Sequence, residues 1–299
     1  MHRASLAACL TACLVATGPA HAAEPLVKLL QTPPPAATAA AAAHPAEPLL
    51  LWSETVREPQ PLAVYFLRAD LRHPACRPVA VVSDDPDGRG PAEAALVSPG
   101  TLFKRHGLIA AVNANAFSRA PNAGKIPGWH HGLHVDIRGL AISNTITRSG
   151  LDHPGATSSS ALAVLNDGSI TIGRPDDLTI IRHAVGDWGA PLLTNGTILP
   201  AADSVRHPRT AVGIDKTGRI LLFAVVDGRR PGHSAGTTLR ELATLMKHHG
   251  CHHAINLDGG GSSVLLYRET PDGPVKTYNR PSGNTHRPVP VLFGIRAAR

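Results

Sequence analysis

The chain has 299 residues, of which 43% are hydrophobic and 17% charged, and its formal net charge at pH 7 is +7. This composition is that of a globular enzyme, and beyond the N-terminal region no stretch approaches the ~20 apolar residues that span a bilayer. The basic balance favours anionic partners such as phosphates or acidic polysaccharides. Nucleic acid is not expected as a partner, because the basic residues are spread along the chain rather than gathered among aromatic residues.

The N-terminus has the three parts of an export signal. Arg3 supplies the positive charge, Leu6 to Ala16 the apolar stretch, and Ala20-His21-Ala22 the small-residue cleavage site. We therefore expect residues 1–22 to be a signal peptide and the protein to be periplasmic or secreted, with no stable membrane insertion after signal cleavage. Residues 23–48 read as an Ala/Pro-rich linker, because such a composition cannot build a hydrophobic core. Residues 49–299 then form one domain.

Two cysteines, Cys76 and Cys251, remain after removal of the signal. In an oxidising compartment they can pair in a disulfide, but they can equally be two small buried thiols. The sequence leaves both alternatives open. Two cysteines are in any case too few for a disulfide scaffold.

Beyond the linker, short runs rich in Val, Ile and Leu alternate with clusters of Gly, Pro, Asn and Asp, which is typical of strands separated by turns. Strands are predicted at 62–67, 79–82 and 109–112. Asn166-Asp167-Gly168 predicts a hairpin turn between 161–165 and 169–172, and residues 215–218 predict another turn before 219–226.

The segment 219–267 predicts a strand, a helix and a second strand. The helix has apolar residues at helical spacing behind a Thr238–Glu241 capping box and ends near Gly250. We therefore expect an α+β fold, a mixed twisted β-sheet with few helices that includes one parallel strand-helix-strand crossover at about 219–267. In a right-handed crossover both strands end at the same edge of the sheet, which would bring Asp227 and Asp258 together.

Three glycines, Gly259 to Gly261, follow Asp258. They allow the backbone to turn with positive φ and to approach a ligand closely. Their amides, with the hydroxyls of Ser262 and Ser263, would form a nest for a phosphate or for sugar hydroxyls. The alternative is a tight turn between two strands.

Four blocks of the sequence resemble the phosphodiester glycosidase family. The longest is Val225 to Ser263, VVDGRRPGHSAGTTLRELATLMKHHGCHHAINLDGGGSS. The others are Ala111 to Ser118 (AVNANAFS), Arg209 to Ile214 (RTAVGI) and Asn279 to Pro290 (NRPSGNTHRPVP). The last block departs from the family pattern, since 283–286 lack the usual acidic residue and Val291 stands where an asparagine is usual.

The resemblance implies an exported hydrolase that cleaves a sugar from a glycosyl-1-phosphodiester, with residues 49–299 as its catalytic domain. It implies a glycosyl-phosphate or polysaccharide substrate, in exopolysaccharide or cell-envelope glycan metabolism. We assign no cofactor and no metal ligand, and the sequence leaves metal dependence undetermined. Asp258 would be the first catalytic carboxylate and Asp227 the second, since a carboxylate can stabilise an oxocarbenium-like state or act as base or nucleophile.

The arginines of these blocks would bind phosphate oxygens bidentately. The substrate-binding residues are expected to be Asn113, Asn115, Arg209, Arg229, Ser234, Gly259, Gly260, Gly261, Ser262, Arg280 and Arg287.

Two other functions stay open. The first is a non-catalytic carbohydrate-binding or assembly protein of the cell envelope, because family resemblance does not establish catalysis. The second is a metal-dependent phosphodiesterase that cleaves the P–O bond, which the histidines around Cys251 and Trp129 raise although no HExxH or CxxC pattern occurs. Trp129 itself either stacks on a sugar or packs in the core. A serine hydrolase is excluded, since GGGSS does not supply the GxSxG elbow. The sequence does not determine the sugar, the anomeric outcome or the oligomeric state.

Overall fold

The computed structural model describes residues 27–29, 31–33, 48–153, 158–189, 191–200, 204–283 and 285–297. The signal peptide predicted at 1–22 lies outside these residues, as does most of the linker predicted at 23–48. Part of that linker is a strand, because β1 (Val27–Leu29) pairs in parallel with β2 (Leu49–Val56). Among the described residues, no helix is long and apolar enough to cross a bilayer.

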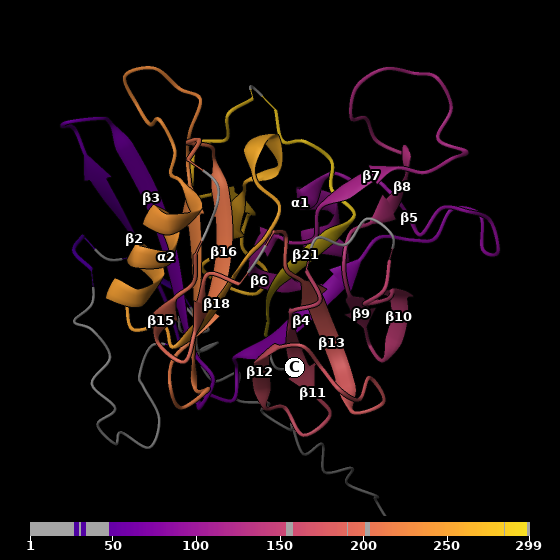
Figure 1. Ribbon diagram of the computed structural model, residues 1–299, viewed down its shortest axis with the longest axis horizontal. Coiled ribbons are helices and arrows are strands. Elements are labelled where there is room, and N and C mark those ends of the chain that lie inside the picture. The colour runs from indigo at the N-terminus through magenta and orange to yellow at the C-terminus, as the bar shows by residue number, and fades with distance from the viewer. Residues whose placement is uncertain are drawn as a thin grey trace, which may run out of the picture.

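Most of the fold is β-structure, and the largest sheet has eight strands in the order β1-β2-β3-β17-β16-β18-β14-β15 (Figure 1). The sheet is mixed, since β1 runs parallel to β2 while the pairs from β2 to β18 are antiparallel. Its other members are β3 (Leu62–Asp70), β17 (Ile220–Val226), β16 (Arg209–Ile214), β18 (His253–Asn256), β14 (Leu193–Thr194) and β15 (Thr197–Ile198).

Three smaller sheets complete the structure. The first has the order β20-β19-β6-β21-β4, with β20 (Lys276–Thr277), β19 (Leu265–Tyr267), β6 (Leu108–Asn113), β21 (Val291–Arg296) and β4 (Arg77–Val82). The second has the order β10-β9-β13-β11-β12, with β10 (Ile146–Ser149), β9 (Ala141–Ser143), β13 (Ile181–Gly186), β11 (Ala161–Leu165) and β12 (Ile170–Gly173). The third has the order β5-β8-β7, with β5 (Ala94–Ala95), β8 (His134–Ile137) and β7 (Phe117–Arg119).

The described helices are α1 (Pro99–Arg105), α2 (Leu239–His248) and the short 3-10 helix η1 (Gly260–Ser262). Helix α2 lies against one face of the eight-stranded sheet (Figure 1), where Leu242, Ala243 and Met246 are buried with Trp52 and Phe66. Burial of this apolar stripe is the main stabilisation of so short a helix.

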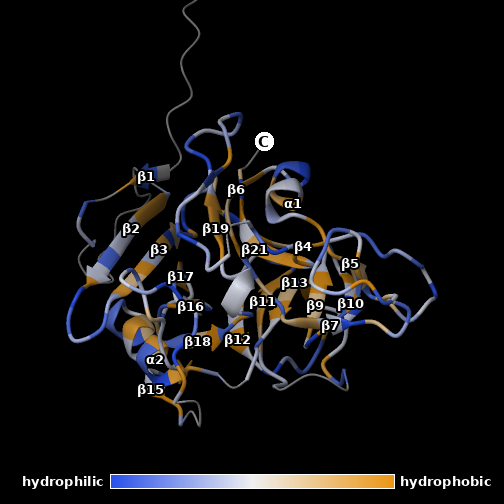
Figure 2. Cartoon of the chain, turned by 90° about the horizontal axis from the view of Figure 1, so that it is seen from above, coloured by the Kyte–Doolittle hydropathy of each residue, from blue (hydrophilic) through white to orange (hydrophobic). Residues whose placement is uncertain are grey.

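The other face of the eight-stranded sheet packs against the smaller sheets and forms the main core. Strands β16 and β17 are buried along their whole length, and the apolar colouring of Figure 2 is concentrated in the strands. Phe223 of β17 meets Phe293 of β21 with ring centroids 5.7 Å apart, which joins two sheets directly. Complete burial of aromatic rings on both sides contributes roughly 1.5–3 kcal/mol per side chain.

The strands, turns and helix start that were predicted from short stretches of sequence are confirmed. The strands predicted at 62–67, 79–82 and 109–112 are parts of β3, β4 and β6. The turn at 166–168 joins β11 to β12 in an antiparallel pair, and the carboxylate of Asp215 closes the turn before β17 by accepting from the amides of Arg219 and Ile220, both at 2.9 Å. The capping box of Thr238 and Glu241 opens α2.

In the crossover predicted at about 219–267, the two strands are not neighbours in the sheet. Strands β17 and β18 follow one another through α2 as expected, but β16 lies between them and pairs antiparallel with both. The two strands therefore run in the same direction two positions apart. The reason is that β16 and β17 form a hairpin, which takes the edge of β17 that β18 would otherwise use.

Cys76 and Cys251 are free thiols. They are buried in different hydrophobic clusters, on the two sides of the eight-stranded sheet. Of the two alternatives that the sequence left open, the structure therefore shows separate buried thiols.

Candidate active site

The two acids predicted to be catalytic lie at one edge of the eight-stranded sheet. Asp227 directly follows β17, and Asp258 lies just beyond the end of β18. The register across β16, with Val226 opposite Arg209 and Ala211 opposite Asn256, brings both to the same edge. Because neighbouring strands are ~4.8 Å apart, one intervening strand separates the two main chains by about 10 Å.

Asp258 is held in place by hydrogen bonds of its backbone. Its amide donates to the Ala114 carbonyl at 2.8 Å, and its carbonyl accepts from Asn113 Nδ2 at 2.6 Å. Burial raises the pKa of the Asp258 carboxyl to about 6, against the opposing effects of the Ser262 hydroxyl, the Arg287 charge and the Gly259 amide. The residue as a whole is nevertheless partly exposed. It is therefore mainly ionised at neutral pH and close to the range where proton transfer is efficient.

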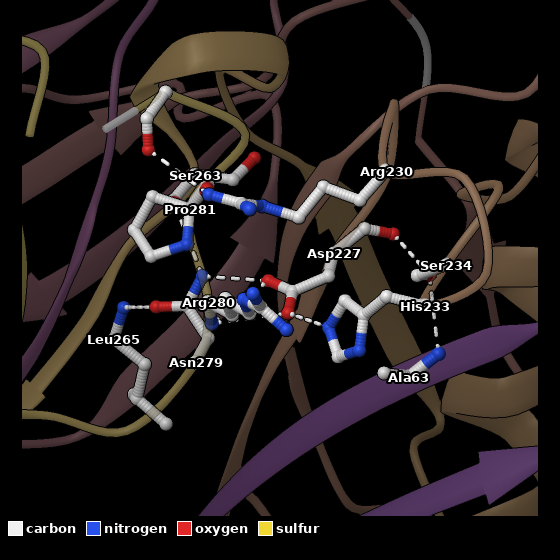
Figure 3. Close-up of polar contacts among 11 residues, drawn as sticks. Ala63, Asp227, Arg230, His233, Ser234, Ser263, Leu265, Asn279, Arg280 and Pro281 are labelled. Atoms are coloured by element: carbon white, nitrogen blue, oxygen red, sulfur yellow. Dashed lines mark hydrogen bonds and ion pairs between the residues drawn. The ribbon is translucent and has the colours of Figure 1, made fainter. Parts of the chain in front are cut away.

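The Asp227 carboxylate, by contrast, is fully buried and surrounded by donors (Figure 3). Its Oδ1 accepts from Asn279 Nδ2 at 2.9 Å, and its Oδ2 lies 2.8 Å from His233 Nε2. The Arg280 amide donates to both oxygens, at 3.2 and 3.0 Å. Burial, followed by the nearby Asp227 charge, raises the pKa of the Tyr65 hydroxyl. Both oxygens are thus occupied, and Asp227 anchors the segment at 279–280.

Residues 259–261 form a tight turn, the glycine turn, in which glycine is required because the chain packs closely there. Gly260 has a φ of +62°, which favours glycine, and a methyl group on Gly259 would lie 2.6 Å from the Pro208 carbonyl oxygen. Two of the three glycine amides of the predicted anion nest, those of Gly259 and Gly260, are occupied within the protein. The Gly259 amide donates to Asp258 Oδ1, and the Gly260 amide donates to the Pro208 carbonyl. The Ser262 and Ser263 amides donate to the carbonyls of Gly259 and Gly260, respectively.

Two arginine side chains supply the positive charge at this turn instead. A methyl group on Gly260 would lie 3.2 Å from Arg229 Nη1, and one on Gly261 would lie 2.5 Å from Arg287 Nη2. The pKa of Arg287 is lowered by burial and by the Arg229 charge, although Asp258 opposes this. The turn therefore brings two guanidinium groups and one carboxylate together, with the positive charge in excess. Such a set suits a phosphate group.

An exposed aromatic ring borders the same arginine. Arg287 Cζ lies 5.9 Å from the centroid of the Trp129 ring, and this ring is 38% exposed. On the other side Trp129 meets Phe117 edge to face, with centroids 5.0 Å apart. One part of the indole is thus fixed by packing while another part stays open to solvent.

Two predicted asparagine ligands are internal. Asn113 is 1% exposed, and its Oδ1 accepts from Thr210 Oγ1 at 2.8 Å and from the Val264 amide at 3.2 Å. Asn115 is 2% exposed and donates to the carbonyls of Arg138 and Leu140. The expectation that they bind sugar hydroxyls is not supported, because their buried amides fix the backbone around Asp258.

Two further predicted ligands have the same internal role. Ser234 is buried, donates to the Asp227 carbonyl at 2.6 Å and accepts from the Ala63 amide at 3.1 Å. Arg209 is 8% exposed and donates to the carbonyls of Thr237 and Val205. Arg280 is exposed, and its backbone amide rather than its side chain reaches Asp227. Of the predicted arginines, Arg229 and Arg287 are thus the ones packed on the glycine turn.

Two residues of this network had no predicted role. Asn279 is 7% exposed and its Nδ2 donates both to Asp227 and to the Ser263 carbonyl, while its Oδ1 accepts from the Leu265 amide at 2.8 Å. His233 is the partner of Asp227 Oδ2. The signal for Asn279 was its place at the start of a matching block. His233 carried no signal beyond its position in the loop after Asp227.

The histidines around Cys251 have packing partners. His249 lies against Phe66 and Trp52, with ring centroids 4.4 and 5.6 Å apart, and its Nε2 is 3.0 Å from Glu54. Within the described ranges, no group of three or more His, Cys, Asp or Glu side chains is arranged to hold a metal ion.

A carboxylate, a glycine turn and two arginines thus lie together at this end of the sheet, and their charges suit an anionic group. The chain belongs to the phosphodiester glycosidase family, whose model matches residues 106–296. The matched segment contains both acids, the glycine turn and both arginines. The SPbeta prophage-derived uncharacterized protein YomE of Bacillus subtilis (strain 168) is 28% identical over 176 residues. That alignment covers 54% of this chain but only 25% of YomE.

Solved structures share the fold. The catalytic domain of zebrafish N-acetylglucosamine-1-phosphodiester alpha-N-acetylglucosaminidase, auto-inhibited by its pro-peptide, matches over 87% of each chain with a TM-score of 0.62 and 19% identity. A hypothetical protein from Synechocystis has a TM-score of 0.55 at 14% identity, over 85% of this chain and 64% of that one. A putative exported protein from Burkholderia pseudomallei K96243 has a TM-score of 0.53 at 15% identity, over 79% of this chain and 74% of that one.

Proposed function

We propose that this protein is an exported phosphodiester glycosidase that hydrolyses a glycosyl-1-phosphodiester, with residues 49–299 as the catalytic domain. The observation that carries the proposal is the Asp258 carboxyl group, with a pKa of about 6, beside the two arginines on the glycine turn. Family membership supplies the reaction class. The predicted signal and the exported structural neighbour support a substrate outside the cytoplasm, in exopolysaccharide or cell-envelope glycan.

The arginines suit the leaving group of this reaction. A phosphodiester leaves as a stable anion, so the departing oxygen needs charge stabilisation more than protonation. Arg287 and Arg229 can hold the non-bridging oxygens and neutralise the charge that develops as the C1–O bond breaks. Water then supplies hydroxide to C1 and a proton to solution, which leaves a free sugar and a phosphate monoester.

Asp258 acts on the sugar side of the bond. As a carboxylate it stabilises the oxocarbenium-like transition state, either by direct attack at C1 or by taking the proton from the attacking water. Asp227 then has a positioning role, because its oxygens are committed to Asn279, Arg280 and His233. The open part of Trp129, next to Arg287, offers a platform on which a sugar ring can stack.

The test is the variant Asp258→Asn with a sugar-1-phosphodiester substrate. We expect kcat to fall by at least about 10³-fold, on the scale of losing an essential catalytic carboxylate, while circular dichroism shows a folded protein. Asp167→Asn, in the exposed turn between β11 and β12, is the control and should keep full activity. Full activity of a folded Asp258→Asn enzyme would remove Asp258 from the mechanism.

Hydrolysis in oxygen-18 water identifies the bond that breaks. Label in the released sugar is expected, since the proposal requires C–O cleavage. Label in the phosphate would show P–O cleavage and favour a metal-dependent phosphodiesterase. Sugar binding without any turnover would instead indicate a non-catalytic carbohydrate-binding protein.

A further inference from the structure

A large cavity lies away from Asp258, at the opposite end of β6. Its volume is about 1280 Å³. Gly107, which precedes β6, lines the cavity, whereas Asn113 at the other end of β6 bonds to Asp258. A strand of this length spans roughly 17 Å. The cavity is therefore separate from the site of the proposed chemistry.

The lining of this cavity is strongly basic. Six Arg and Lys side chains from five elements or turns face two acidic residues, Asp167 and Asp272. The lining cations are Arg77, Lys104, Arg105, Arg182, Arg268 and Arg296.

Part of this positive charge has no ion-pair partner. In the part of the chain that the structure describes, Arg77, Lys104 and Arg182 form no ion pair, while Arg105 pairs with Asp84 at 2.7 Å. A bound anion would supply the missing partner charge for Arg77, Lys104 and Arg182.

The pKa values of two histidines in the lining are lowered, in part by the same arginine charges. Burial, together with the charges of Arg296 and Arg182, lowers the pKa of His183 to about 4. Burial, Arg296 and Arg105 lower the pKa of His106. Both rings are neutral at pH 7, so the positive potential in the cavity comes from the arginines and the lysine.

We propose that this cavity binds an anionic glycan chain, with carboxylate or phosphate groups on successive sugars. The volume exceeds the roughly 300–1,000 Å³ of sites for single small molecules, which favours an oligomeric ligand. The cations come from separate elements and so suit repeated charges rather than one phosphate. Asn144 and Asn166 add polar groups for sugar hydroxyls. The cavity would hold a further part of a polymeric substrate, or a glycan chain next to that substrate, on the side of the protein away from Asp258.

The test uses heptagalacturonate as the anionic probe and maltoheptaose as the neutral one, in calorimetric titrations of the mature protein. The cavity variant is Arg77→Glu with Arg182→Glu, both exposed at its rim. The matched control is Arg89→Glu with Arg240→Glu, which makes the same charge change at exposed sites outside the cavity. We expect heptagalacturonate alone to bind, at least about tenfold more weakly in the cavity variant and nearly unchanged in the control.

A small sugar-1-phosphodiester separates this site from the proposed catalytic one, because both double variants should turn it over at the unaltered rate. Equal weakening of heptagalacturonate binding in both variants would show a general charge effect and overturn the proposal. Equally tight binding of maltoheptaose would do the same. Binding to phosphatidylserine vesicles but not to heptagalacturonate would assign the surface to membranes instead.

Discussion

The Nδ2 atom of Asn279 donates to Oδ1 of Asp227 at 2.9 Å across 52 residues of sequence. The same amide group reaches the Ser263 carbonyl and accepts from the Leu265 amide. One buried side chain thereby connects the end of β17, the exit of the glycine turn and the start of β19. The position of the turn on which Arg229 and Arg287 pack depends on this contact.

Replacing Asn279 with alanine should therefore destabilise the protein and impair the site together. The change leaves Asp227, the Ser263 carbonyl and the Leu265 amide short of partners in a buried place, at a cost of about 3 kcal/mol. Urea unfolding measures the loss. Asn166→Ala, which removes an exposed amide on the opposite side of the sheet, should change stability by less than about 0.5 kcal/mol. Similar losses in both variants would contradict the role given to Asn279.

The pKa of Asp258 predicts the acid side of the activity profile. If the ionised carboxyl is the active form, kcat/KM should rise with pH through about 6 and then level off. The profile is measured with a substrate whose own groups do not titrate between pH 4 and 8. An activity that falls as pH rises through this range would mean that Asp258 works as an acid.

The raised pKa of Asp258 also predicts how stability depends on pH, in the direction opposite to that of activity. Because the pKa in the folded state is above the unfolded value, Asp258 contributes no penalty below about pH 4, and stability is lost as pH rises through about 6. Asp258→Asn should therefore be roughly 2 kcal/mol more stable than the natural protein at pH 8 and equal to it at pH 4. Urea unfolding at the two pH values measures this, and a variant less stable at pH 8 would contradict it.

The buried carboxyl of Asp187 predicts a second pH dependence of stability, which is unrelated to catalysis. Its carboxyl is 1% exposed, accepts from the Asn256 amide at 3.1 Å, and has a pKa raised by burial to about 7. Stability should again fall as pH rises, here through about 7. Asp187→Asn keeps an oxygen for Asn256 and should gain roughly 2–4 kcal/mol at pH 8 with little gain at pH 4. Asp177→Asn, at an exposed carboxylate, serves as control, and the same pH-dependent gain there would refute the assignment.

Gly261→Ala tests the packing of Arg287 on the turn. The new methyl group would come within 2.5 Å of Arg287 Nη2, so the guanidinium must move away from Asp258. We expect kcat/KM for the phosphodiester to fall by about 10²-fold, the scale expected for a misplacement of about 1 Å. Gly100→Ala in α1 meets only Ser98 Oγ at 3.9 Å and should leave activity unchanged. Unaltered kinetics in Gly261→Ala would mean that Arg287 does not act from this position.

The elements that the sequence predicted correctly are those with local signals. The Thr238–Glu241 capping box and the turn at Asp215 involve residues a few positions apart, so their chemistry is visible in a short window. The insertion of β16 between β17 and β18 depends on pairings between distant segments. No local pattern records which edge of a strand a hairpin will occupy.

The same distinction explains the outcome at the site. Asp258 and the glycine turn were recognised because they are contiguous. The roles of Asn113 and Ser234 were not, since a polar residue at a strand end looks the same whether it meets a ligand or a distant backbone group. Asn113 meets Asp258 across 145 residues, and Ser234 meets Ala63 across 171.

The position of β16 also limits how this protein can be redesigned. All six of its residues pair with β17 on one side, and the last four, Ala211 to Ile214, also pair with β18 on the other. Deleting one residue would slip both ladders at once, turning inward-facing side chains outward along the centre of the fold. The spacing between the two acids is thus inseparable from the integrity of the core, and attempts to accommodate new sugars should vary the loops around Trp129 and Arg287 instead.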